Sequence, residues 1–324
     1  MRRALVVSGL ALCAGCLGFR DNVATVTDAD GSADHRVFRI GAATQIMMEP
    51  VLWRLEDKKV IDFDRPVTEF FKGDLPPEFA SVTLRMLHDG TSGMPRDILD
   101  PMRLGDVWAT TRYLFAGGNP YGDFDRRERF VERLWEPAVR NALVRREPGR
   151  SDMGYALLLM AICDRLGQTA DELCGKYLVE PFGLKDTAFV ATQGMRGRVT
   201  KPCAGAIPYC LLRGMEVSDH RGEGEVTLYA EGMLSSCYDL LRVCYVIMPH
   251  LDRAKHILDE RTLPCGRKVW CRFGTVPGGN FFVGFEPQDS HAVVVLGNTT
   301  GQRLADGLAV MEDLANPPEE KPAP

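Results

Sequence analysis

The sequence lacks an excess of positive charge, an interior apolar run of membrane-spanning length and any internal repeat. Its 39 Lys and Arg against 44 Asp and Glu give a formal net charge of −5. That balance argues against a nucleic-acid partner, because phosphate contacts need clustered basic side chains. Without a long interior apolar run, a polytopic membrane protein is excluded as well. What remains is a 324-residue chain, 45% hydrophobic and 26% charged, with the composition of a globular protein of about two domains.

Metal-ligand spacing is also missing from the sequence. The C-x-x-C from Cys13 to Cys16 has no second pair and no neighbouring histidine. His88 stands beside Met86 and Leu87 and is expected to be a packed or capping residue. Acidic or Cys neighbours at ligand spacing are absent around His220, His250, His256 and His291. We therefore predict no metal site and no cofactor.

Ten cysteines are present, at irregular positions rather than in a compact framework. Several stand in apolar helical segments, among them Cys163 and Cys244, where a free thiol behaves as a small buried hydrophobe. They are predicted to be reduced core residues.

Residues 1–19 have two interpretations. Two arginines followed by an apolar run up to Cys16 are typical of a lipoprotein signal, which predicts a protein lipidated at Cys16 in the cell envelope. The alternative is a β-hairpin with its turn at Ser8-Gly9, which predicts a cytoplasmic protein. We favour the hairpin, because Gly9 and Gly18 match the glycine spacing of the family compared below.

Periodicity along the chain predicts helices over residues 42–56, 126–135, 154–167 and 301–315, with Pro50 kinking or locally opening the first. Residues 95–125 form a long, partly irregular segment, and 227–248 are predicted to be a turn followed by a helix. Residues 280–287 and 291–298 have the composition of neighbouring strands.

This order predicts an α+β fold in which both chain ends build one antiparallel sheet and the middle forms a helical domain. The sheet domain is assigned to residues 1–56 and 225–315, the helical domain to 57–224, and a disordered tail to 316–324.

Segments distributed over most of the chain occur in the order found in one known family. They are FRIGAATQ, LEDKKVIDFDRPV, VTLRMLHDGTSGMP, GYALL, VEPFGLKDTAF, EGMLSSCYDLLRV, VPGGNFFVGFEP and AVVVLGNTTG. The sequence thus resembles the superfamily of serine β-lactamases, penicillin-binding proteins and esterases, especially its class C-like branch. The resemblance implies the β-lactamase/transpeptidase fold and a serine hydrolase ancestry.

The first motif of that family is S-x-x-K at a helix N-terminus, which supplies the nucleophile and, one turn later, the base. Here the two positions are Ala42 and Gln45. Ala has no nucleophilic oxygen and Gln is no useful base, so acyl transfer by the family route is excluded. Thr44 and Ser92 are not substitutes, since Thr44 points away from the cleft on a helix and Ser92 matches a structural turn residue.

The other two motifs are degenerate too. At the Tyr-x-Asn position stand Arg150, Ser151 and Asp152, and at the Lys-Thr-Gly position stand Arg272, Phe273 and Gly274 before Pro277-Gly278. An engineered nucleophile knockout would change one residue rather than all of these. The resemblance therefore predicts a natural pseudoenzyme.

The family's oxyanion hole consists of backbone N–H groups, here those of Ala42 and Thr275, and backbone donors survive side-chain substitution. With Arg150, Arg272 and Gly274 nearby, a peptide or carboxylate ligand is one predicted partner. Three alternatives stay open. In the first, the two arginines pair with Asp152 or a surface acid instead of binding a ligand. In the second, the chain is an active hydrolase of the same fold whose nucleophile is Ser151 or a cysteine. In the third, Phe273 and the arginines close the pocket, and the chain is a structural or protein-interaction module.

Overall fold

The computed structural model describes residues 23–26, 35–97, 126–200, 225–276, 279–297 and 304–315. The two interpretations of residues 1–19, most of the irregular segment 95–125, Pro277-Gly278, His220 and the tail 316–324 lie outside this part of the chain.

The strands are β1 (Val23–Val26), β2 (Phe38–Arg39), β3 (Leu234–Ser235), β4 (Asp259–Thr262), β5 (Lys268–Val276), β6 (Gly279–Glu286) and β7 (His291–Gly297). The α-helices are α1 (Ala43–Asp57), α2 (Leu84–His88), α4 (Arg127–Leu134), α5 (Pro137–Arg145), α6 (Asp152–Leu166), α7 (Ala170–Cys174), α8 (Glu180–Phe182), α9 (Glu225–Glu231), α10 (Cys237–Ile247), α11 (Leu251–Ala254) and α12 (Leu304–Ala315). Single turns of 3₁₀-helix are η1 (Val67–Glu69), η2 (Pro77–Ser81), η6 (Met248–His250) and η7 (Lys255–Ile257), and η4 (Gly175–Val179) is a π-helical turn.

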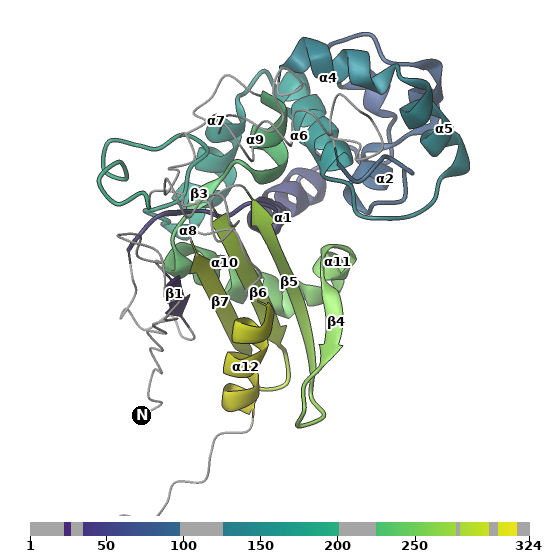
Figure 1. Cartoon of the computed structure of the whole chain (residues 1–324). Helices are drawn as coiled ribbons and strands as arrows, with labels where there is room; N and C mark the ends of the chain where they lie inside the picture. The colour runs from purple at the N-terminus through teal and green to yellow at the C-terminus, as the bar shows by residue number, and fades with distance from the viewer. Residues whose placement is uncertain are drawn as a thin grey trace, which may run out of the picture.

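The main sheet is antiparallel, with strand order β1-β7-β6-β5-β4 (Figure 1). Its first strand comes from the N-terminal part of the chain and pairs with β7, Val23 opposite Gly297. The prediction that both ends of the chain share one sheet is therefore confirmed. The pair β2–β3 forms a separate small sheet, Phe38 opposite Ser235.

Both faces of this sheet are covered, which explains why β6 and β7 are almost continuously apolar. Alternate residues of β6, such as Phe281 and Phe285, join the large core on the side of α1 and α10. Phe282 between them joins a smaller core beneath α12, together with Val293 and Val295 of β7. Figure 1 shows α12 lying across one face of the sheet and α10 behind the other.

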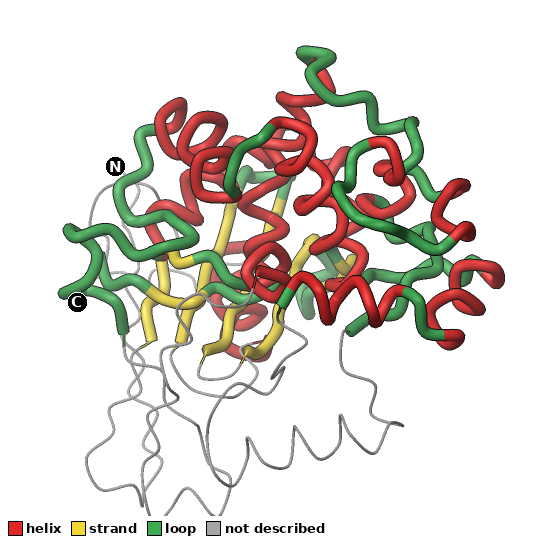
Figure 2. The backbone as a smooth tube through the Cα atoms, turned by 90° about the horizontal axis from the view of Figure 1, so that it is seen from above, coloured by secondary structure: helices red, strands yellow, loops and turns green. Residues whose placement is uncertain are grey.

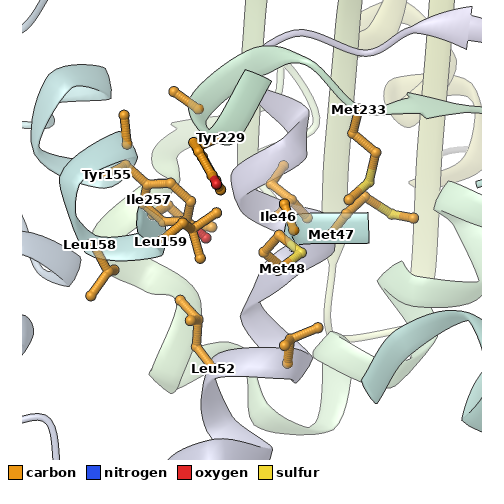
Figure 3. Packing of buried hydrophobic residues seen from close by; sticks show 14 of the residues in the cluster. Ile46, Met47, Met48, Leu52, Tyr155, Leu158, Leu159, Tyr229, Met233 and Ile257 are labelled. Atoms are coloured by element: carbon orange, nitrogen blue, oxygen red, sulfur yellow. The ribbon is translucent and has the colours of Figure 1, made fainter. Parts of the chain in front are cut away.

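Most of the other helices, among them α2, α4, α5 and α6, lie beyond one end of the strands (Figure 1), so that in the view from above helices overlie the strands (Figure 2). Within this part, α1 and α6 are buried along nearly their whole length. Figure 3 shows Leu158 and Leu159 of α6 across from Met48 and Leu52 of α1. Helix α6 begins at the side-chain cap of Ser151, whose Oγ accepts from the Gly154 N–H at 2.7 Å.

One sequence prediction about helices needs correction. Residues 227–231, predicted as a turn, belong to α9, which ends directly before Gly232. Its apolar residues Val226, Tyr229 and Ala230 are buried against α6, so the tertiary contact stabilises a helix that the neighbouring glycine disfavours. Helix α1 contains Pro50 and continues to Asp57, in agreement with the predicted extent of this helix.

The cysteine prediction is confirmed for the described residues, with one exception. The thiols of Cys163, Cys174, Cys237, Cys244 and Cys271 are free and buried, whereas that of Cys265 is free and exposed. In the same part of the chain, no helix combines the length and apolar character that crossing a bilayer requires.

Candidate functional site

The N-terminus of α1 is the starting point of the site. Gly41 has φ of 53°, a left-handed conformation that a side chain would strain, and it turns the chain from Ile40 into the helix. Ala42 is the N-cap and offers no capping side chain. Within the described residues the Ala42 N–H donates to no backbone group, so it stays available as an oxyanion donor.

One helical turn later, the Gln45 side chain forms a hydrogen bond with the carboxylate of Asp152. Its Nε2 donates to Asp152 Oδ1 at 2.6 Å, across from the first turn of α6. Gln45 is only 3% exposed, and the Tyr155 hydroxyl donates to its backbone carbonyl at 3.3 Å. A neutral amide is also far too weak a base to abstract a proton from a nucleophile.

Two guanidinium groups complete the site. Arg272 on β5 and Arg150 before α6 each donate to the carbonyl of Ile257, both at 3.2 Å. Arg272 also lies 3.7 Å from Asp152 Oδ1, and Arg150 forms an ion pair with Asp259. The structure thus brings Gln45, Asp152, Arg150 and Arg272 into one connected network beside Ala42, and the pairing of the arginines with acidic residues is observed.

The two arginines differ in their exposure to solvent. Arg272 is 5% exposed, and this burial lowers its pKa below the usual value. The negative charge of Asp152 acts in the opposite direction but does not outweigh the burial. The side chains of Arg150 and Asp259 are 37% and 32% exposed, so their ion pair exchanges with solvent more readily. Burial also raises the pKa of Tyr155, which keeps its phenol protonated.

Strand β5 carries the third degenerate motif, and here one expectation is wrong. Phe273 does not close the pocket, because its side chain packs in the cluster beneath α12, on the face of the sheet opposite Arg272. The alternation of side chains along a strand causes this separation. Gly274 leaves room for a neighbour, since a Cβ there would lie 2.8 Å from Cε1 of Phe281. Thr275 stands opposite Asn280 in the β5–β6 register.

Ser151 and Thr44 have structural partners. The Ser151 hydroxyl donates to the Pro95 carbonyl and caps α6, and Thr44 Oγ1 accepts from the Met233 N–H at 3.2 Å. Burial raises the pKa of Cys163 and Cys174 to about 12 and that of Cys271 to about 11. These thiols are protonated at neutral pH and are poor nucleophiles.

Sequence motifs did not reveal the acceptors that join the arginines, the Ile257 carbonyl and Asp259. Ile257 is the last residue of η7 and Asp259 follows soon after it, and neither belongs to a family motif. A hydrogen bond to a backbone carbonyl places no requirement on the side chain of that residue. Asp259 is a polar residue at the first position of β4, which was the only available signal.

The fold and the site now permit comparison with known proteins. The sequence profile of the β-lactamase family matches residues 20–315, so the chain belongs to the β-lactamase family. No curated protein sequence matches the chain significantly.

Solved structures with the same fold are distant in sequence. A class C β-lactamase from Rhodobacter sphaeroides is 16% identical, with a TM-score of 0.62 over 86% of this chain and 85% of that one. A β-lactamase from Sulfitobacter sp. EE-36 is 16% identical, with a TM-score of 0.61 over 87% and 85%. The octameric penicillin-binding protein homologue from Pyrococcus abyssi is 17% identical, with a TM-score of 0.63 over 91% of this chain and 73% of that one. At such identities the likeness shows the fold alone.

Proposed function

We propose that this chain is a non-catalytic member of the β-lactamase family. The observation that carries the proposal is the arrangement of Ala42, Gln45 and Asp152. Covalent catalysis by the family route needs a hydroxyl and an adjacent base at the start of α1. In their place stand a methyl group and an amide that already donates to Asp152.

Other described nucleophiles do not replace the missing serine. The Ser151 hydroxyl donates to the Pro95 carbonyl and accepts from the Gly154 N–H as the cap of α6. The cysteines in the core are buried, and their raised pKa values leave little thiolate. This supports a binding role over a hydrolase that uses a different nucleophile.

The proposed ligand is a small peptide or another molecule with a carboxylate. Three features support it: the unengaged N–H of Ala42, the guanidinium of Arg150, and the edge of β5. Strand β4 pairs with β5 only from Lys268 to Cys271, so in the described residues the edge of β5 beyond Cys271 has no β4 partner. An extended peptide can pair with such an edge, and its carboxylate would replace Asp259 on Arg150.

Absence of acylation is the first expected result. After incubation with a β-lactam, intact-mass spectrometry should show the unmodified mass, because the described part of the site holds no nucleophile beside a base. An active serine β-lactamase treated in parallel verifies the reagent. A stoichiometric adduct on this chain would overturn the non-catalytic assignment.

Ligand binding is tested by thermal shift and calorimetry with an acyl-D-Ala peptide. We expect the free-acid peptide to raise the melting temperature, and its carboxamide form to do so far less, since the carboxamide lacks the charge that Arg150 recognises. Arg150→Ala should abolish the difference between the two peptides. The control Arg65→Ala removes an exposed arginine that pairs with Glu69 four residues along the chain, and this variant should still distinguish the two peptides. If the wild-type chain responds to neither peptide, a structural or protein-interaction module that does not use this site is the better description.

A further inference from the structure

A second polar cluster lies in the core, one helical turn beyond Gln45. Its centre is Glu49 of α1, a carboxylate with no solvent exposure. His88, the last residue of α2, places Nε2 at 3.1 Å from both Glu49 oxygens. His256 in η7 places its Nε2 at 3.8 Å from Glu49 Oε1. Sequence spacing hid this cluster, because its members come from three separate segments.

The donor atoms of Glu49, His88 and His256 all lie within 4.8 Å of one another. For a tetrahedral zinc ion with bonds of about 2.0–2.1 Å, the expected distance between two ligand atoms is about 3.3 Å. The separations of 3.1 and 3.8 Å in this cluster lie on either side of that value. Two imidazoles and one carboxylate are also a ligand set that zinc uses in proteins.

The orientation of both rings supplies an independent argument. His88 donates through Nδ1 to Asp89 Oδ1 at 2.8 Å, and His256 hydrogen-bonds the backbone of Arg253. Metal-ligating histidines are held in this way, with the second ring nitrogen bound to a carboxylate or a backbone carbonyl. The result is that both Nε2 atoms face the same carboxylate.

His256 Nε2 provides the most direct sign of a missing partner. The atom is buried and has no hydrogen-bond partner in the described structure, although a buried polar atom normally has one. A protein that used His256 only for packing would satisfy or expose this nitrogen.

We propose that Glu49, His88 and His256 bind a divalent transition-metal ion, most readily zinc, and that Asp89 is the residue that positions His88. The ion would join α1, α2 and η7, three elements far apart in the chain. Because η7 also contains Ile257, whose carbonyl holds Arg150 and Arg272, the metal would fix one wall of the candidate site. In the metal-free protein a proton on His88 Nε2 takes the ion's place opposite Glu49, and metal binding displaces it.

Cobalt(II) is the probe for the test, added to the full-length chain after treatment with a chelator. We expect one equivalent to give the visible absorption of tetrahedral cobalt without a thiolate charge-transfer band, and zinc to compete for the same site. Zinc should also raise the melting temperature of the chelated protein. The absence of the thiolate band is the criterion that separates this cluster from the cysteines.

Three variants complete the experiment. His256→Gln should eliminate the cobalt spectrum, and Asp89→Asn should weaken metal affinity by about 10–100-fold, because Asp89 is half-exposed and only positions His88. His250→Gln is the control, since His250 packs edge-on against Trp53 outside the cluster and should leave the spectrum unchanged. The proposal is overturned if the wild-type chain binds no cobalt, if a thiolate band appears, or if Asp89→Asn and His256→Gln both bind as tightly as the wild type.

Discussion

Replacing His88 with Gln is expected to reduce the free energy of unfolding of the metal-free protein by about 3–5 kcal/mol near pH 6, and by much less near pH 10. The reason is the ion pair between His88 and the fully buried Glu49. Burial alone would lower the pKa of His88, but the charge of Glu49 and the hydrogen bonds to Asp89 and Glu49 outweigh it and raise the pKa to about 10. His256 also faces this cluster, and burial lowers its pKa, so His88 carries the charge.

The direction of the pH dependence follows from this raised pKa. Below about pH 6.5, the ordinary value for His, the imidazole is protonated in both the folded and the unfolded chain, and the full stabilisation is present. Between about pH 6.5 and pH 10 the unfolded chain loses the proton while the folded chain keeps it. The stabilisation therefore declines across this range and is lost as the pH rises through 10.

Urea unfolding of wild type and His88→Gln at several pH values between 6 and 10, with a chelator present, measures this effect. Phe63→Leu is a suitable control, since Phe63 packs edge-on against His88 and carries no charge. Its effect on the free energy of unfolding should be the same at every pH. A constant difference between wild type and His88→Gln across the range would contradict the assigned ion pair.

Asp239→Ala is expected to reduce the free energy of unfolding by about 3–4 kcal/mol. Asp239 Oδ2 accepts from the Lys185 N–H at 3.0 Å, the Asp186 N–H at 2.7 Å and the Thr187 hydroxyl at 2.9 Å. Burial raises the pKa of Asp239. Truncation would leave these donors without their acceptor in a site where Asp239 is only 1% exposed, which costs more than a lost surface contact.

A control from the same region is Asp171→Ala, because Asp171 accepts a single hydrogen bond, from the Phe189 N–H at 2.8 Å. It should cost about 1 kcal/mol. Hydrogen exchange locates the effect: the amides of Lys185 and Asp186 should lose protection in Asp239→Ala and keep it in Asp171→Ala. Equal losses of stability in the two variants would refute the role given to Asp239.

Periodicity in the sequence was sufficient to predict much of the fold. The predicted helices at 154–167 and 301–315 correspond to α6 and α12 of the described residues, and the predicted strand at 280–287 corresponds to β6, because their apolar patterns match the faces that become buried. The short helix α9 was missed, since its stability comes from packing on α6 rather than from its own residues.

The sequence predicted those residues of the site that occupy positions of the family motifs. Aligned positions identified Gln45, Asp152 and Arg272, which the structure places in one network. The prediction that Phe273 closes the pocket was wrong, because a motif gives positions along a strand but not the face to which each side chain points. The cluster around Glu49 carries no motif, since its members meet only when α1, α2 and η7 pack together.

The pairing of β1 with β7 has a consequence for the synthesis of the protein. Val23 leaves the ribosome long before its partner Gly297, because most of the described chain lies between them. Until then β7 is missing from the centre of the sheet, between β1 and β6. Such long-range pairing slows folding and leaves strand edges exposed to other chains. A nascent chain of this protein is therefore expected to keep β1 without its partner strand until β7 has emerged, and to depend on chaperones until that time.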